Sequence, residues 1–262
     1  MSDDPGEKLF ERYLEQRGYT VLAYEPDLGT AKRPDYLVRA DGTDVVVEVE
    51  SFETTVVQTP TEPGGSAALS DLRPLRRKIS AGAEQLKGIG GYPLIVVIAN
   101  PYHIAVPLLP SHLVAAMYGD LAFEFLPDGT QQWRLGRNGR LHVDEPDGTS
   151  HGNHPYLSAV GVLRVGSALD MNIIADLREH AGAGNPLQIV AHALSAEDNP
   201  QVQQDTLSLD LFETVSDTSV AVTRTIFNRT GDTRWGQVSA GRYGPIADTD
   251  AVASAPDTTP AG

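Results

Sequence analysis

Two β-rich segments on either side of an Asp-Gly pair constrain the fold of this chain more than any other feature. Residues 35–40 read DYLVRA, and residues 44–51 read DVVVEVES. Valine and tyrosine favour strands, and Asp-Gly favours the tight turn that joins two antiparallel strands. The sequence therefore predicts a β-hairpin with its turn at Asp41-Gly42.

The predicted hairpin brings three acidic residues together. If the turn has two residues, counting back along both strands places Asp35 opposite Glu48, and a longer loop moves its partner only to Val49 or Glu50. Glu48 and Glu50 share one face of their strand because side chains alternate. Clustered carboxylates repel one another unless a proton or a divalent cation lies between them. The alternative is that these acids lie on a solvated edge strand.

The segments around the hairpin predict an α/β fold. Asp4-Pro5-Gly6-Glu7 is typical of a helix start, and Gly18 of a helix end. Residues 93–99 form the continuous apolar run PLIVVIA, which is typical of a strand buried on both faces. The predicted order is α-β-β-β-α-β, with a helix over 4–18, strands over 20–25, 35–40 and 44–51, a helix over 71–88 and a strand over 93–99.

Pro34-Asp35 followed by Glu48-Val49-Glu50, after a helix that carries Glu7, resembles the PD-(D/E)xK nuclease superfamily. The resemblance covers residues 1–100. It implies a restriction-endonuclease-like αβββαβ core, in which helices flank a mixed central sheet, and the hydrolysis of DNA phosphodiester bonds with Mg²⁺ or Mn²⁺. By this likeness Asp35, Glu48 and the Val49 carbonyl hold the metal.

Glu7 and Glu50 are two further catalytic candidates in this resemblance. Glu7 sits where archaeal Holliday-junction resolvases carry a glutamate that completes the metal shell, eleven residues before a Gly-aromatic pair, here Gly18-Tyr19. Glu50 stands where the superfamily usually has a lysine, and some of its restriction endonucleases use this ExE variant. A carboxylate there could accept a proton from water or hold a second metal, whereas a lysine orients the water and neutralises charge. Lys32 and Lys78 are both candidates for a displaced cation.

The helix expected over residues 71–88 concentrates basic side chains. Its apolar residues form a separate stripe that is free to pack, so the cations can point at solvent or at a phosphate backbone. An ordinary solubilising face is the alternative. We expect contacts with DNA from this helix through Arg73, Arg76, Arg77, Lys78, Gln85 and Lys87.

The composition limits the choice of partner and location. The chain has 20 Lys plus Arg against 35 Asp plus Glu, a formal charge of −15, which repels DNA except where cations gather. Two alternatives to the nuclease therefore stay open: an inactive nuclease-fold module that binds nucleic acid or protein, and an interaction protein whose acidic surface binds a basic partner.

The lack of cysteine excludes thiolate metal sites. The apolar runs are too short to cross a membrane, so we expect a cytoplasmic protein. Two cuts on a duplex would favour a homodimer.

The rest of the chain gives weaker signals. We expect residues 101–200 to extend the sheet and add accessory elements to the nuclease core of residues 1–100. A C-terminal appendage over 201–247 and a disordered tail over 248–262 complete the predicted organisation. His142, Asp144, His151 and His154 lack the spacing of a transition-metal site and are assigned to a polar loop. The further elements predicted are helices over 109–118 and 170–180 and strands over 120–126, 156–165 and 187–193.

Overall fold

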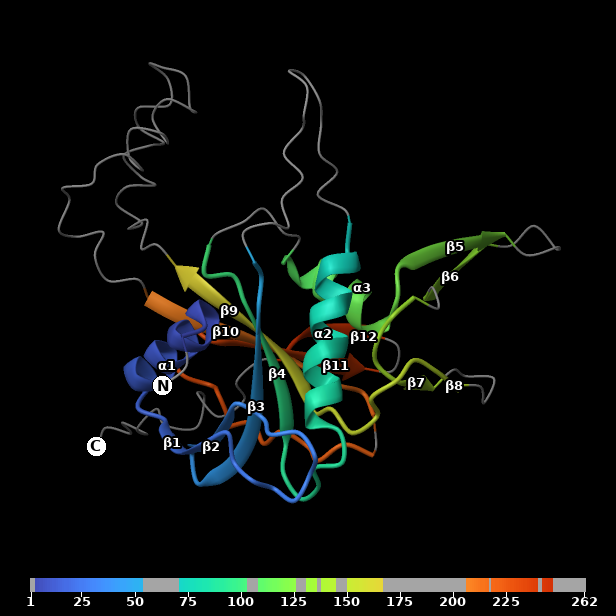
Figure 1. Cartoon of the computed structure of the whole chain (residues 1–262). Helices are drawn as coiled ribbons and strands as arrows, with labels where there is room; N and C mark the ends of the chain where they lie inside the picture. Colours follow the sequence, from blue (N-terminus) through green and yellow to red (C-terminus); the bar gives the residue numbers. More distant parts are fainter. Residues whose placement is uncertain are drawn as a thin grey trace, which may run out of the picture.

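A mixed sheet of eight strands forms the centre of the protein (Figure 1). The computed structural model describes residues 3–53, 71–102, 108–125, 131–135, 138–144, 150–166, 206–216, 218–239 and 242–246. The strand order is β1-β2-β3-β4-β9-β10-β11-β12. The pairs β3–β4, β4–β9 and β10–β11 are parallel, and the other neighbours are antiparallel. The strands are β1 Thr20–Tyr24, β2 Tyr36–Ala40, β3 Thr43–Ser51, β4 Leu94–Ala99, β9 Ala159–Gly166, β10 Thr206–Glu213, β11 Thr233–Ser239 and β12 Arg242–Pro245.

The first six elements follow the predicted order α-β-β-β-α-β. Helix α1 spans Pro5–Arg17, and the Asp4 side chain caps it by accepting hydrogen bonds from two backbone N–H groups. Gly18 ends this helix in the left-handed region, at φ 71°. Helix α2 spans Arg73–Leu86 and so begins two residues later than predicted.

The hairpin of β2 and β3 has the predicted register. Ala40 pairs with Thr43, and Tyr36 pairs with Val47. Asp41 and Gly42 both have positive φ, 49° and 84°, as a two-residue turn that matches the twist of the strands requires. This register continues one step further to place Asp35 beside Glu48.

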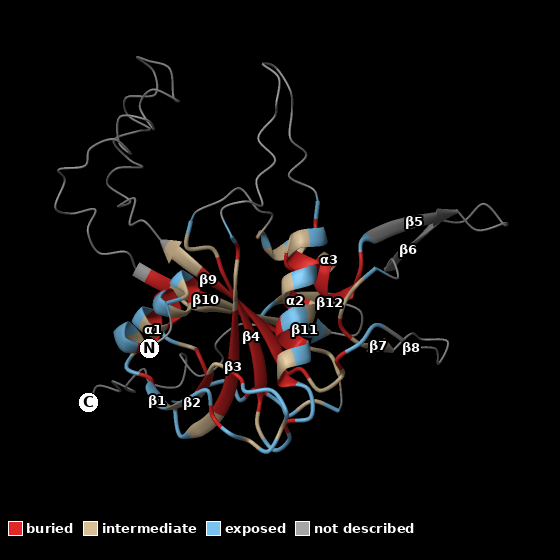
Figure 2. Cartoon of the chain, viewed as in Figure 1, coloured by how far each residue is buried: buried red, intermediate tan, exposed pale blue. Residues whose placement is uncertain are grey.

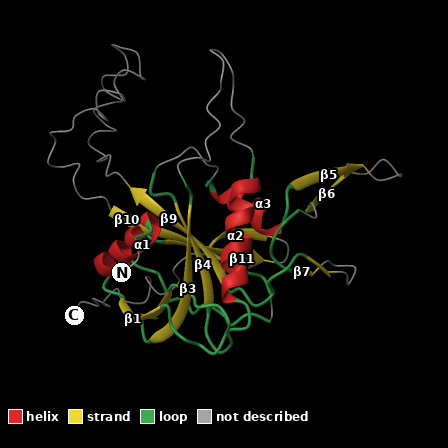
Figure 3. Ribbon diagram, in the orientation of Figure 1, coloured by secondary structure: helices red, strands yellow, loops and turns green. Residues whose placement is uncertain are grey.

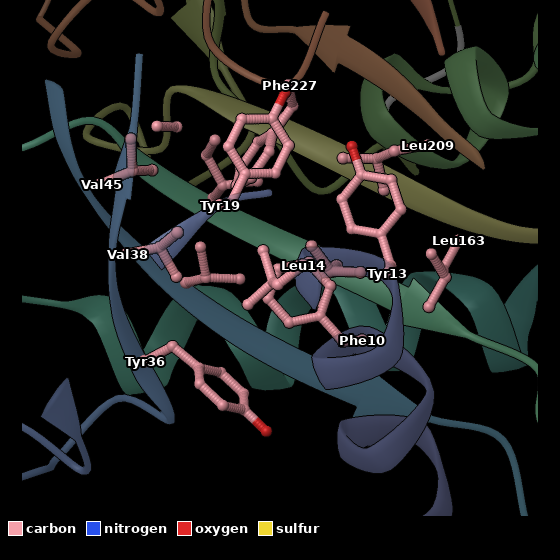
Figure 4. Packing of buried hydrophobic residues seen from close by; sticks show 14 of the residues in the cluster. Phe10, Tyr13, Leu14, Tyr19, Tyr36, Val38, Val45, Leu163, Leu209 and Phe227 are labelled. Atoms are coloured by element: carbon pink, nitrogen blue, oxygen red, sulfur yellow. The ribbon is translucent and has the colours of Figure 1, made fainter. Parts of the chain in front are cut away.

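Helices cover both faces of the sheet (Figure 3). On one face, Phe10, Tyr13 and Leu14 of α1 pack on Tyr36 and Val38, together with other buried residues (Figure 4). The opposite face packs against α2 and α3, which spans Pro110–Tyr118. The central strands between these layers are buried over most of their length (Figure 2). The side chains of β3 alternate between the two cores, and this alternation fixes which of its residues face α2.

The second half of the chain extends the same sheet. Its predicted helix over 109–118 and strands over 120–126 and 156–165 correspond to α3, β5 (Leu121–Phe125) and β9. β5 pairs with β6 (Gln131–Leu135), and β7 (Val143–Asp144) pairs with β8 (Ser150–His151), in two small separate sheets. The expected C-terminal appendage instead contributes β10, β11 and β12 to the main sheet. The helix predicted over 170–180, the strand over 187–193 and the tail over 248–262 lie outside the described residues. Among the described helices, none has the length and apolar character needed to cross a bilayer.

Candidate active site

Asp35 is held by one hydrogen bond to Glu48 and another from Val49, where β2 begins beside the second half of β3. The Asp35 backbone N–H donates to Glu48 Oε2 at 3.2 Å. The Val49 N–H donates to Asp35 Oδ2 at 2.7 Å. The hairpin therefore brings Asp35 and Glu48 together as predicted, with the Asp35 carboxylate held across the backbone of β3.

Burial and mutual repulsion make this carboxylate group hard to ionise. Only 6% of Glu48 is exposed, and its pKa is raised to about 9, first by burial and then by the charge of Asp35. Burial also raises the pKa of Asp35 to about 7, against the opposing hydrogen bond from Val49. The charges of Glu50 and Glu7 raise the pKa of both groups further. Electrostatics thus couple the four predicted catalytic residues, and the group needs protons or a cation near neutral pH.

Glu50 forms an ion pair with Lys78 of α2. Lys78 Nζ lies 3.0 Å from Glu50 Oε2, and both side chains are largely shielded from solvent. The close approach of α2 depends on Gly82, because a Cβ there would crowd Val96 and the Glu50 side chain. Burial raises the pKa of Glu50 even though the hydrogen bond from Lys78 opposes it.

Lys78 and Lys32 have different hydrogen-bond partners, and only the partner of Lys78 belongs to the acidic cluster. Lys32 Nζ donates instead to the carbonyl of Glu84, near the C-terminal end of α2. From the sequence, either lysine could replace the one missing at position 50. In the structure, Lys78 contacts a predicted catalytic carboxylate and Lys32 contacts a backbone carbonyl.

Glu7 reaches the cluster from the N-terminal turn of α1. Tyr36, whose ring is buried, extends its hydroxyl to Glu7 Oε2 and Glu11 Oε1, each at 3.3 Å. Asp4 Oδ1 accepts a hydrogen bond from Ser51 Oγ at 2.7 Å, and this contact ties the start of α1 to the end of β3. Sequence reasoning missed Glu11, although its position one helical turn after Glu7 was a usable signal.

Asp35 and Glu48 have the oxygen chemistry that a magnesium site requires. Mg²⁺ is commonly held by one or two carboxylates, with waters and substrate phosphates completing its shell. In a strand, the N–H and C=O of one residue point to the same neighbour, so the Val49 carbonyl points toward the side on which Asp35 lies. Within the described ranges, no group of three or more His, Cys, Asp or Glu side chains is arranged to hold a metal. Two carboxylates alone do not fill the shell of a divalent cation, so an ion held by Asp35 and Glu48 would need oxygens from water or substrate as well.

The basic residues predicted to contact DNA have different environments. Arg76 is buried, and its guanidinium donates to Asp120 and to the Ala115 carbonyl, so it does not face solvent. This burial removes Arg76 from any phosphate-binding surface. Arg73 and Lys87 are exposed but form ion pairs with Asp71 and Glu84.

Arg77 and Gln85 are the remaining members of that set. Arg77 is exposed, and no ion pair to it occurs within the described part of the chain. Gln85 is half-buried. It follows Gly82 by about one helical turn, on the side of α2 that faces Glu50.

The histidines assigned to a polar loop form no metal group among the residues that the structure describes. His154 is buried, with Nδ1 2.9 Å from the Tyr156 hydroxyl, which donates to the carbonyl of Ala83. Burial lowers the pKa of His154. These contacts make His154 part of the packing beneath α2.

Comparison of the chain with protein-family models, curated proteins and solved structures finds no match.

Proposed function

We propose that this chain is a metal-dependent nuclease of the PD-(D/E)xK type that hydrolyses DNA phosphodiester bonds. The observation that carries the proposal is the partly buried Asp35–Glu48 pair, which a hydrogen bond joins and whose pKa values are raised first by burial and further by neighbouring acidic groups. A fold gains nothing in stability from burying repelling carboxylates, so their grouping favours a functional role. The helix-strand order of residues 5–99 gives independent support.

Asp35, Glu48 and the Val49 carbonyl would hold Mg²⁺ or Mn²⁺ in this proposal, and Glu7 would complete the shell through water. The bound ion would lower the pKa of a water and stabilise the charge that develops on the phosphate. The Val49 N–H fixes the orientation of the Asp35 carboxylate, and the Asp35 N–H does the same for Glu48. These two backbone hydrogen bonds preorganise the metal ligands.

Glu50 and Lys78 would together take the place of the usual lysine. Glu50 accepts the proton of the attacking water, a role that its raised pKa favours because a stronger base takes up a proton more readily. Lys78 stabilises the Glu50 carboxylate before the proton arrives and offers positive charge to the phosphate.

A second candidate function is a nuclease-fold module that binds nucleic acid or a protein without cutting. The observation that favours it is the ion pair itself, in which Lys78 neutralises the charge of Glu50. A catalytically inactive site would retain this pair as a structural contact.

Cleavage assays separate the two functions. The full chain is incubated with DNA and with RNA in Mg²⁺, in Mn²⁺ and in EDTA, beside Asp35→Asn. Asp44→Asn is the matched control, because Asp44 lies on the same hairpin but forms an exposed ion pair with Arg39. The nuclease proposal predicts metal-dependent cleavage by wild type and Asp44→Asn that Asp35→Asn lacks. Absence of cleavage under every condition supports the binding module.

A further inference from the structure

Tyr24 is an exposed aromatic residue at the edge of the sheet. It ends β1, the edge strand, and 52% of the residue is exposed. Its ring meets the ring of Tyr36 edge-on, with centroids 5.6 Å apart and an interplanar angle of 62°. Tyr36 packs in turn against Phe10 of the core. The ring of Tyr24 is therefore supported on one side while much of its surface stays open to solvent.

The backbone places Tyr24 next to the candidate active site. Tyr24 pairs with Tyr36, the residue after Asp35, and the Glu25 N–H donates to the Asp35 carbonyl at 2.9 Å. The chain leaves the strand directly afterwards, at Glu25, with φ 43°. Tyr36, which contacts the Tyr24 ring, also sends its hydroxyl to Glu7. Tyr36 thus connects Tyr24 to two predicted catalytic residues, to Glu7 by a hydrogen bond and to Asp35 through the backbone.

The connection from Tyr24 to Asp35 also carries exposed positive charge. Lys32 and Arg33 are both exposed, and 58% of the Arg33 side chain is accessible. The ion pair of Arg33 with the exposed Asp27 is long, at 3.8 Å. Basic side chains and an open aromatic ring are the two features that proteins combine to bind single-stranded nucleic acid, and the segment over residues 24–33 carries both.

We infer that Tyr24 stacks against an unpaired nucleobase, so that the substrate presents unpaired nucleotides next to the bond that is cut. This inference rests on the proposed nuclease function. A base in an intact duplex is stacked between its neighbours and offers no free face to a side chain. The net charge of −15 also weakens binding that depends on phosphate contacts alone, whereas stacking is not reduced by it.

Binding to oligonucleotides that contain 2-aminopurine, a base whose fluorescence falls on stacking, tests the inference. The full chain carries Asp35→Asn to prevent cleavage, and Mn²⁺ is present throughout. Single-stranded DNA, the matching duplex and single-stranded RNA are compared by anisotropy and by 2-aminopurine emission. We expect single strands to bind about tenfold more tightly than the duplex, with quenched emission. The single strand that binds more tightly, DNA or RNA, identifies the preferred source of the base.

Variants at Tyr24 isolate the ring. Tyr24→Phe keeps the aromatic face and should bind within about twofold of the parent, whereas Tyr24→Leu should weaken single-strand binding about fivefold or more and remove the quenching. Tyr24→Thr, which suits a strand, repeats the test if the leucine variant folds poorly. The control is Val238→Ala. Val238 is a comparably exposed apolar residue on β11, near the opposite edge of the sheet from β1.

Two outcomes overturn the inference: duplex binding as tight as single-strand binding, or unchanged single-strand affinity in folded Tyr24→Leu and Tyr24→Thr. Cleavage by wild type is measured separately. Cleavage that does not depend on Tyr24 contradicts stacking and leaves the nuclease proposal standing. Tyr24-dependent binding without any cleavage supports stacking and overturns the nuclease proposal.

Discussion

Lys78 of α2 and Glu50 of β3 form an ion pair, with Nζ 3.0 Å from Oε2, beside the partly buried Asp35–Glu48 pair. A cation therefore lies at the acidic cluster although the motif position itself holds a glutamate. The pair connects the helix to the strand, and its partners lie 28 residues apart in sequence.

Replacing Lys78 tests whether this cation takes part in catalysis. Lys78→Met should lower the cleavage rate about 10²-fold, within the usual range for groups that assist proton transfer. It should also move the pH profile upward, because Glu50 loses the partner that lowers its pKa. Lys8→Met is the control and should stay within about twofold, since Lys8 forms an ion pair with the exposed Asp3, away from Glu50. Equal effects of the two substitutions would assign Lys78 no special role.

Reversing the ion pair tests the functional link between Glu50 and Lys78. Glu50→Gln should reduce cleavage about 10²-fold because an amide cannot accept the proton. Glu50→Lys recreates the common motif but places two ammonium groups together, so alone it should destabilise the protein. Adding Lys78→Glu should restore stability and part of the cleavage. If the double variant is no better than either single variant, in melting temperature and in rate, the two positions are not coupled.

The raised pKa of Glu48 predicts how the metal-free protein responds to pH. In the folded state the group keeps its proton up to about pH 9, whereas the unfolded chain loses it near 4.5. Between these values the folded state binds more protons, so the free energy of unfolding should fall as pH rises, by up to about 1.4 kcal/mol per pH unit for one proton.

Glu48→Gln removes this penalty and should be more stable than wild type at pH 8 in EDTA, with a smaller difference at pH 5. Asp44→Asn is the control, because Arg39 lowers the pKa of Asp44 and the substitution should give no such gain. Urea unfolding at both pH values measures the effect. A Glu48→Gln variant less stable than wild type at pH 8 would show that Glu48 is not under electrostatic strain.

Local sequence signals predicted the hairpin register and the caps of α1, because Asp-Gly, Asp-Pro and the valine-rich strand act over a few residues. Those signals were enough to pair Asp35 with Glu48. They could not select Lys78 over Lys32, because the choice depends on how closely α2 packs on β3, which Gly82 permits. The sequence could not predict the burial of Arg76 for a similar reason, since its partner Asp120 lies 44 residues further along the chain. The place of β10–β12 in the sheet depends equally on long-range pairing.

Arg77 and Arg76 are neighbours on α2, but we expect the first to contribute to DNA binding and the second to stability. Arg77→Ala removes an exposed cation, so it should weaken DNA binding and reduce the salt dependence by about one counterion, without changing the melting temperature. Arg76→Ala should lower the stability, by about 1 to 3 kcal/mol, because it removes a buried guanidinium that donates to Asp120 and to the Ala115 carbonyl. Affinity at several salt concentrations, with thermal unfolding, distinguishes them. Equal loss of DNA affinity in two folded variants would contradict this division.

Electron paramagnetic resonance of Mn²⁺ in the presence of wild type, Asp35→Asn and Asp44→Asn shows whether the Asp35–Glu48 pair binds a metal ion. We propose that Asp35 and Glu48 hold a divalent cation next to the Glu50–Lys78 ion pair. We predict a bound ion in wild type and in Asp44→Asn, and an affinity lower by about tenfold or more in Asp35→Asn. Wild type that binds no Mn²⁺, or Asp35→Asn that binds it as tightly as wild type, would contradict the account.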